Sequence, residues 1–198
     1  MKKVFGSLIT AGLLVAGGAF AQTDSHDVNI KIPNVLQLRI TDGTGNNASG
    51  SAAIEFDYQT AAANVDTYLN TVNGGGGDLD PTSVTGFGDV IVFANRASWE
   101  VEVSSTALNF TDNLGLGSVS GAGVALADVS VAPSGAAGTG VSSVTPAWDL
   151  SGGTVASGVK TSGWSSLGFD GDDYVFTVNG DEDPGEYTTV VTYSITAP

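Results

Sequence analysis

Hydrophobic and polar residues alternate along several short segments of this chain, which is the spacing typical of β-strands. The longest of these segments covers positions 28–40. Its apolar face carries Val28, Ile30, Ile32, Leu36, Leu38 and Ile40. Pro33 interrupts the segment and removes a backbone hydrogen-bond donor, which favours an edge strand or a bend. We therefore predict a long strand over 28–40, close to the edge of a sheet.

A second clear alternation surrounds Trp99, where Val101 and Val103 share the face of the indole and Glu100 and Glu102 take the other face. This pattern predicts a half-buried strand with Trp99 pointing inward. Similar but shorter signals predict strands near 54–58, 90–93, 129–131, 148–150, 174–178 and 187–198. Four consecutive glycines within 73–78 predict a flexible connector. No segment shows a persuasive helical spacing, and the 28 glycines disfavour helices further.

Many short strands joined by polar turns predict an all-β fold, an antiparallel β-sandwich of the immunoglobulin-like kind. The first residues do not fit this pattern. Two lysines, an apolar run and Ala19-Phe20-Ala21 have the order of a signal peptide and its cleavage site. We therefore expect a signal peptide over 1–21, a single domain over 22–198, and export to the cell surface, the medium or the periplasm of a bacterium.

The amino-acid composition excludes some classes of binding partner. The chain carries 6 basic and 21 acidic residues, a formal net charge of −15. Such a surface repels nucleic acid and anionic lipid, because both need clustered lysine and arginine. After cleavage no transmembrane segment is predicted. There is no cysteine, so the fold does not depend on disulfides although export is expected.

Catalytic residues are hard to assemble from this sequence. The only histidine, His26, lies just beyond the predicted cleavage site, where a chain end rarely holds an imidazole in place. No cysteine nucleophile, zinc ligand set or phosphate-binding glycine loop is found. We therefore predict a protein that is not an enzyme, with no catalytic, cofactor or metal residues.

Two acidic clusters could nevertheless place carboxylates on adjacent loops, at 170–173 and 181–183. Oxygen ligands of this kind suit Ca²⁺. Neither cluster has the spacing of an EF-hand loop, and charge runs more often form a solvated surface. Ca²⁺ binding remains open at this point.

The pairing of Trp99-Glu100-Val101 with a strand at the end of the sequence resembles the WxL family of surface proteins. The second element consists of Tyr187, then Val191-Thr192-Tyr193-Ser194-Ile195, then Pro198. The resemblance implies a secreted β-rich domain that attaches non-covalently to peptidoglycan. Val101 stands where the family has leucine. The terminal strand is also similar to those of exported spore-coat and fimbrial-type β-sandwiches.

Aromatic residues are the candidates for contacting a glycan: Trp99, Trp148, Trp164, Tyr187 and Tyr193. The alternation around Trp99 favours a core position, because large aromatics dominate core packing. Tyr187 and Tyr193 are expected to have buried rings with hydroxyls at the rim. Trp148 and Trp164 lie in regions rich in glycine and serine and are the better candidates for exposed stacking platforms.

Two functions stay open. The first is a module of the cell envelope that binds peptidoglycan or another surface glycan, or other envelope proteins. The second is a structural subunit of a surface layer or fibre that self-associates, because an alternating strand near the mature N-terminus could be donated to a neighbouring subunit. Pairing of that strand within its own domain is the alternative, since free strand edges are usually suppressed.

Overall fold

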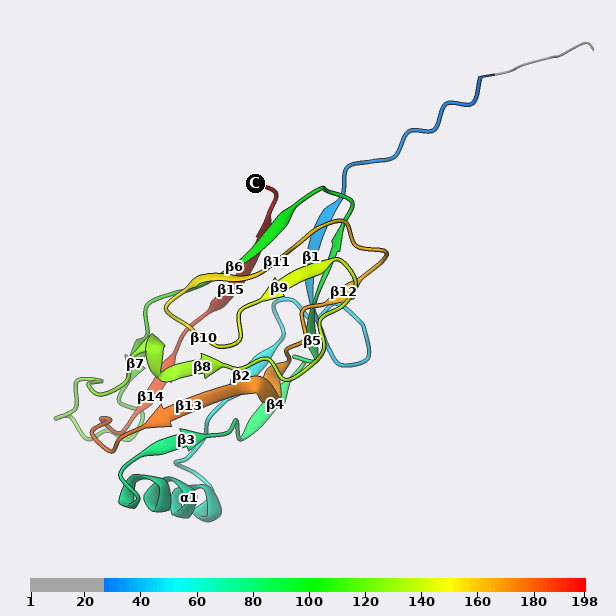
Figure 1. Cartoon of the computed structure of the whole chain (residues 1–198). Coiled ribbons are helices and arrows are strands. Elements are labelled where there is room, and N and C mark those ends of the chain that lie inside the picture. Colours follow the sequence, from blue (N-terminus) through cyan, green and yellow to red (C-terminus); the bar gives the residue numbers. More distant parts are fainter. Residues whose placement is uncertain (1–26) are drawn as a thin grey trace, which may run out of the picture. The chain divides into compact units, whose positions relative to one another are not determined.

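The computed structural model describes residues 27–198, so the signal peptide expected over 1–21 and His26 lie outside the described residues. The chain divides into two units, Met1–Ile32 and Pro33–Pro198. All the strands and helices among the described residues belong to the second unit (Figure 1). This boundary lies within the segment that was expected to form one long strand.

The second unit is built from antiparallel sheets. One sheet has the order β1 (Leu36–Thr41), β5 (Asp89–Ala94), β12 (Ser165–Ser166). A second has the order β15 (Val191–Thr196), β6 (Trp99–Ser105), β11 (Gly153–Gly158), β9 (Val141–Val144). A third has the order β10 (Trp148–Asp149), β8 (Val129–Val131), β13 (Tyr174–Val178), β3 (Gly77–Leu79).

Two small two-stranded sheets and three helical segments complete the unit. The sheets pair β14 (Glu186–Thr188) with β7 (Asn109–Thr111), and β2 (Ala53–Glu55) with β4 (Ser83–Thr85). The helical segments are α1 (Ala62–Asn73) and the 3₁₀ turns η1 (Leu126–Asp128) and η2 (Gly171–Asp173). No helix within 27–198 has the length and apolar character that crossing a membrane requires.

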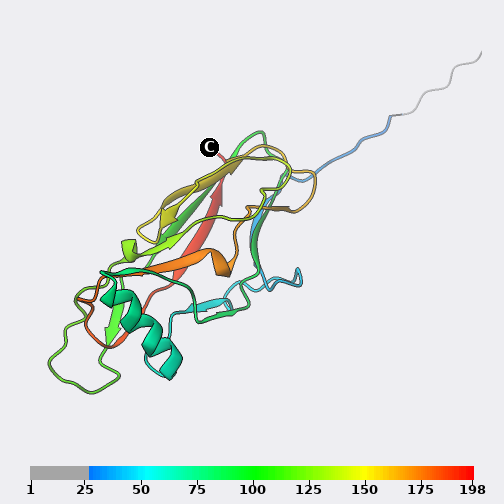
Figure 2. The same cartoon turned by 60° about the horizontal axis from the view of Figure 1, so that its bottom comes forward.

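A single hydrophobic core joins the three larger sheets. Strand β5 contributes Val90 and Val92, and β6 contributes Trp99 and Val101, all at most 1% exposed. Val131 of β8 is also fully buried in this cluster. Because inward residues of facing strands interdigitate in this way, the strands form the layered arrangement of a β-sandwich (Figure 2). The all-β, sandwich-like prediction is confirmed.

Several strand predictions are confirmed closely. Strands β8, β10 and β13 lie where short strands were expected, and β6 buries Trp99, Val101 and Val103. Two predictions need correction. The strand expected over 28–40 is formed only at Leu36–Thr41, and the last strand is divided into β14 and β15.

The prediction that no helix forms is also wrong, because α1 covers Ala62–Asn73. Its half-buried residues include Val65, Tyr68 and Val72, which fit the helical spacing of i, i+3 and i+7. None of its residues is fully buried, so the apolar stripe is narrow and gives a weak signal in the sequence. The glycines expected to form a connector end this helix at Gly74 and begin β3.

Candidate functional site

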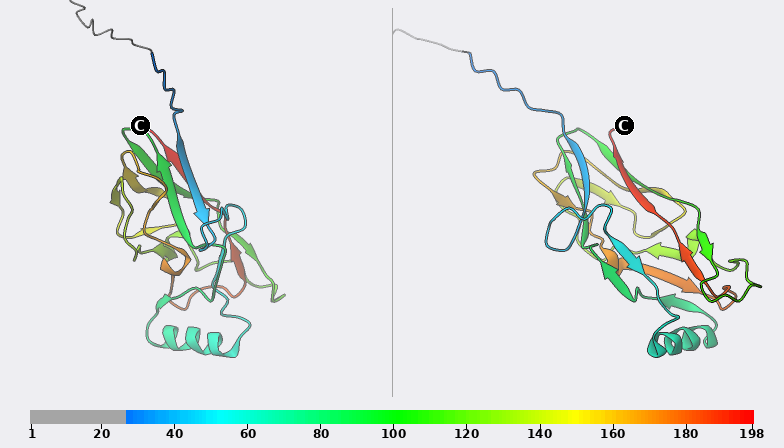
Figure 3. Two further views of the ribbon diagram at one scale, coloured as in Figure 1. Left: turned by 90° about the vertical axis from the view of Figure 1, so that its right-hand side faces the viewer. Right: turned by 180° about the vertical axis from the view of Figure 1, so that it is seen from behind.

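Strands β1 and β15 lie next to each other without pairing. β1 is the edge of its sheet and hydrogen bonds to β5, while β15 is the edge of another sheet and hydrogen bonds to β6. The two run in opposite directions, and the start of β1 lies beside the end of β15 (Figure 3). The second edge of β15 is therefore free, while that of β1 is free at its start and closed at its end, where the Ala48 N–H donates to the Ile40 carbonyl at 2.8 Å. Unpaired backbone groups on a free edge can bind a further strand.

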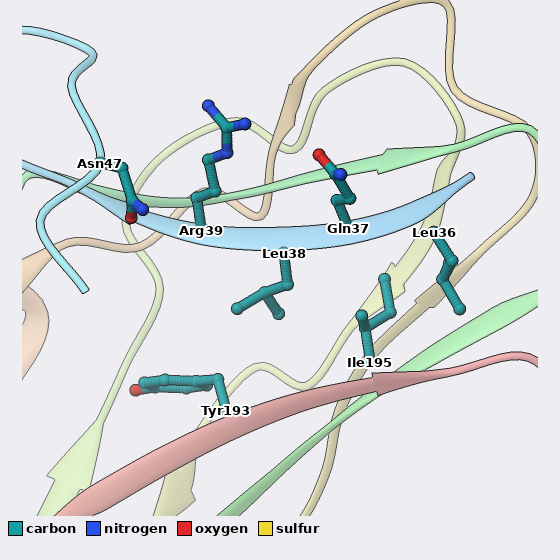
Figure 4. Close-up of a pocket in the computed structure, with 7 residues that line it drawn as sticks. All are labelled: Leu36, Gln37, Leu38, Arg39, Asn47, Tyr193 and Ile195. Carbon is teal, nitrogen blue, oxygen red and sulfur yellow. The ribbon is translucent and has the colours of Figure 1, made fainter. Parts of the chain in front are cut away.

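A groove with a volume of about 430 Å³ lies between these two strands. Figure 4 shows Leu38 pointing from β1 towards β15 and Ile195 pointing back towards β1, while the ring of Tyr193 lies sideways between the two strands. Gln37 and Arg39 lie on the opposite face of β1 and point away from β15. Leu36 and Asn47 complete the lining. The groove thus has apolar side chains between the strands and polar side chains around them.

The position of Tyr193 in the groove is fixed by a cluster of aromatic rings. Its ring lies 5.9 Å from that of Trp148, 5.7 Å from that of Phe169 and 6.4 Å from that of Phe87, measured between centroids. Its hydroxyl is hydrogen bonded to the hydroxyl of Tyr174. Burial raises the pKa of Tyr193 well above its usual value and raises that of Tyr174 to about 12. Both hydroxyls in this part of the groove therefore stay protonated well above neutral pH.

The side chain of Asn95 anchors the chain just before β1. Its amide nitrogen donates a hydrogen bond to the Pro33 carbonyl at 2.7 Å, and its oxygen accepts one from the Val35 N–H at 2.8 Å. The Asn95 N–H donates a further bond to the Val35 carbonyl at 3.1 Å. Residues 33–35 contain neither a turn nor a bend. The N-terminal segment is thus held at Pro33, at the edge of the second unit.

Three apolar side chains of the segment before Pro33 are strongly exposed. Val28, Ile30 and Ile32 are 70%, 79% and 77% exposed. They alternate with polar residues, so they would lie on one face if the segment were extended. Alternating apolar residues of this kind are not normally left in water, because burying each one stabilises a structure by about 1.5–3 kcal/mol.

The aromatic residues predicted to bind a glycan do not lie together in one site. Trp99 is 1% exposed, and its indole N–H donates a hydrogen bond to the Val159 carbonyl at 2.6 Å. Trp148 is half-buried beside Tyr193, and its indole nitrogen has no partner in the described part of the chain. The half-buried Tyr187 packs on Phe110 and donates to the Asp183 carbonyl at 2.8 Å. Only Trp148 and Tyr193 lie together.

Trp164 is the predicted aromatic that the structure leaves most open to solvent. It is 41% exposed, and the guanidinium of Arg39 stacks over its ring at 4.3 Å. The ring of Phe93 lies 5.8 Å away between centroids. These three side chains form a small surface platform on the sheet that contains β1, and Arg39 also lies at the rim of the groove.

The acidic clusters serve mainly to hold loops. Asp173 accepts hydrogen bonds from the backbone N–H groups of Ser134 and Asp170, at 3.1 and 3.0 Å. Glu182 accepts from the backbone of Asn179 at 2.7 Å and from the hydroxyl of Tyr68. Within residues 27–198 no group of three or more acidic, histidine or cysteine side chains is arranged to hold a metal ion. Ca²⁺ binding remains a prediction.

Asp183 links the loop before β14 to a second loop at 120–122. It accepts hydrogen bonds from the backbone N–H groups of Ser120 and Ala122, at 2.9 and 3.0 Å. Bonds from Ala122 and then Ser120 lower the pKa of this carboxyl. A carboxylate whose pKa is lowered on folding stabilises the protein above its unfolded pKa, about 3.9, and loses that effect as the pH falls through the folded pKa.

We expect Asp183→Asn to lower the melting temperature at pH 7 and to have progressively less effect below about pH 4. Asparagine keeps the shape and mimics the protonated acid, so the difference in melting temperature should shrink as the pH falls through the folded-state pKa of Asp183. The measurement is thermal unfolding of both proteins from pH 7 to pH 2. A difference in melting temperature that stays constant over this range would contradict the assigned role of the charge.

Comparison with known proteins gives no match to a family model. Curated protein sequences give no match to this chain. Solved structures give no match either.

The sequence analysis did not identify the groove. Leu36 and Leu38 were placed on the apolar face of the strand expected over 28–40, but nothing in the alternation shows which strand edges remain free. Strand order depends on contacts between distant parts of the chain, and here the first and last strands of the second unit meet. The signal that was available is the interruption at Pro33 within an otherwise continuous apolar face.

Proposed function

We propose that this protein is a non-catalytic structural subunit of a surface layer or fibre, and that its subunits associate by strand donation. The observation that carries the proposal is the groove between the free edges of β1 and β15, in a chain that also has an alternating apolar segment before Pro33. An extended peptide that adds to a free sheet edge gains main-chain hydrogen bonds, and pockets for alternate side chains give specificity.

The expected export fits this function, because a polymer built from donated strands must assemble outside the cell to form a surface structure. The acidic composition also fits, since a high net charge keeps separate subunits from non-specific association. Specific pairing then depends on backbone hydrogen bonds and apolar side chains rather than on attraction between charged surfaces.

Size measurement of the exported form tests this proposal. Light scattering on the eluate of a sizing column, over a wide range of loading concentrations, should give masses that rise in steps of one subunit. Negative-stain electron microscopy of the concentrated sample should show linear particles. A single subunit mass at every concentration would refute self-assembly.

The second candidate function is binding of peptidoglycan or a related glycan, as the WxL resemblance implies. The observation in its favour is the exposed platform of Trp164, Phe93 and Arg39, since aromatic faces stack on sugar rings and a cation adds to the surface. Co-sedimentation with isolated sacculi tests this candidate. Pelleting that is lost in Trp164→Ala, with the fold intact, would support it, and a protein that stays in the supernatant would exclude it.

A further inference from the structure

The direction and register of the donated strand can be inferred from the groove itself. We propose that residues 28–32 of a second copy of this chain add to the free edge of β15 in the antiparallel direction. Val28 then lies opposite Ile195, Ile30 opposite Tyr193, and Ile32 opposite Val191. This inference rests on the proposed function, and it makes the assembly an open head-to-tail polymer.

The direction follows from where the chain enters and leaves the second unit. Pro33 precedes β1, so each subunit's Pro33 lies at the end of the second unit where β1 begins and β15 ends, which we call the Leu36 end (Figure 3). A donated strand antiparallel to β15 has its last residue, Ile32, at the opposite end. The donor subunit therefore lies at the end opposite to the acceptor's own Pro33, and each new subunit extends the polymer in one direction.

The reverse direction leads to a different assembly. It would place the donor's Pro33 at the Leu36 end, beside the acceptor's own Pro33. With both Pro33 residues at the same end, two subunits can each donate a strand to the other and form a closed dimer. A head-to-tail contact that does not close into a ring gives a filament instead. Antiparallel pairing is also slightly more stable per residue than parallel pairing.

The register follows from matching the apolar faces. The inward residues of β15 are Val191, Tyr193 and Ile195, which lie opposite Ser105, Val103 and Val101 of β6. The donated segment also has three apolar residues at alternate positions. A shift by two residues leaves one of them beyond the end of the strand, and a shift by one turns all of them to the polar face.

The polar face of the donated segment fits its surroundings in this register. Asn29 lies opposite Ser194 and Lys31 opposite Thr192. Ser194 is itself paired with Glu102 of β6, and Glu102 is exposed. Lys31 is the basic residue of the segment, and this placement brings its ammonium group to the side of the sheet that carries Glu102. Strand β15 lies between Lys31 and Glu102, so the two side chains do not form a direct cross-strand pair, but a basic side chain on this acidic face is favourable.

The competing occupant is the chain's own segment, folded back as a hairpin onto β1. Such a hairpin needs a tight turn at 33–35, and it would run parallel to β15 because β1 and β15 are antiparallel. The Asn95 side chain binds Pro33 and Val35 and holds these residues without a turn. The anchor therefore favours a second copy as the occupant.

Engineered disulfides test both direction and occupant, because the chain contains no cysteine of its own. In the proposed register Asn29→Cys with Ser194→Cys places the two thiols directly opposite each other, within disulfide range. The matched control is Lys31→Cys with Ser194→Cys, whose thiols are then diagonal neighbours and too far apart. The readout is a non-reducing gel after mild oxidation, with light scattering run on the same samples.

A covalent ladder from the first variant, at least tenfold stronger than from the control, is the expected result. A ladder from the Lys31 control stronger than that from the first variant would overturn the proposed direction, because parallel pairing of Val28 with Val191 would bring position 31 opposite Ser194. Polymers seen by light scattering without a ladder from the first variant would overturn the register while leaving the proposed function in place. Single subunits throughout would refute the proposed function as well.

Discussion

Ile30→Asp is expected to abolish self-assembly, weakening the association by at least about a thousandfold. Burying an isoleucine side chain contributes about 2–3 kcal/mol, and placing a carboxylate in an apolar site adds a desolvation cost of several kcal/mol. Each 1.4 kcal/mol corresponds to a factor of ten in affinity. Ile30 is 79% exposed, so this substitution should leave the fold of the single subunit unchanged.

Asn29→Asp is the matched control for this experiment. It introduces the same charge at the neighbouring position, but on the polar face of the segment. We expect its polymers to differ little from those of the unmodified chain, since exposed charges contribute at most about 1 kcal/mol. Light scattering over a concentration series compares the three proteins. Equal loss of assembly in both variants would show that charge alone, and not the apolar face, governs association.

Trp99→Ala is expected to lower the free energy of unfolding by about 3–5 kcal/mol, the usual range for removing a large aromatic from a core. Trp99 is 1% exposed, and its indole N–H is bonded to the Val159 carbonyl. Gly158 packs directly against the ring, and a side-chain Cβ at that position would clash with it. Truncation therefore leaves both a cavity and an unpaired carbonyl.

Urea unfolding followed by tryptophan fluorescence or circular dichroism measures this effect. Trp164→Ala is the control, because that ring is 41% exposed and its removal should cost less than about 1 kcal/mol. If Trp99→Ala were no more destabilising than Trp164→Ala, the central core position of Trp99 would be contradicted. Trp99 would then be free for the ligand contact that the family resemblance implies.

The sequence predicted where strands form better than it predicted which strands lie side by side. Alternation around Trp99 identified β6 and its buried face correctly, because period-two spacing depends only on local geometry. The helix α1 was not predicted, because its apolar stripe is narrow and lies among small polar residues. The stripe consists of Val65, Tyr68 and Val72. Gly74 to Gly76 also suggested a flexible connector, although here they terminate the helix.

The groove illustrates what the sequence could not supply. The continuous apolar face over 28–40 is divided at Pro33. Leu36 and Leu38 belong to β1 of the second unit. The apolar residues before Pro33 are exposed: Val28, Ile30 and Ile32. Pro33 marked the break, but only the strand order shows that β1 and β15 each keep a free edge. That order arises from contacts between residues far apart in the chain.

Mixing two complementary variants tests strand donation most directly. Ile30→Asp has a defective segment and an intact groove, whereas Leu38→Asp has an intact segment and a groove blocked by charge. Each variant alone should remain a single subunit, with folding checked by thermal unfolding and with Ile195→Asp as a second groove variant. Mixed in equal amounts, they should form a complex of two subunits and nothing larger. A mixture that stays at the mass of one subunit, or polymers formed by either variant alone, would contradict the account.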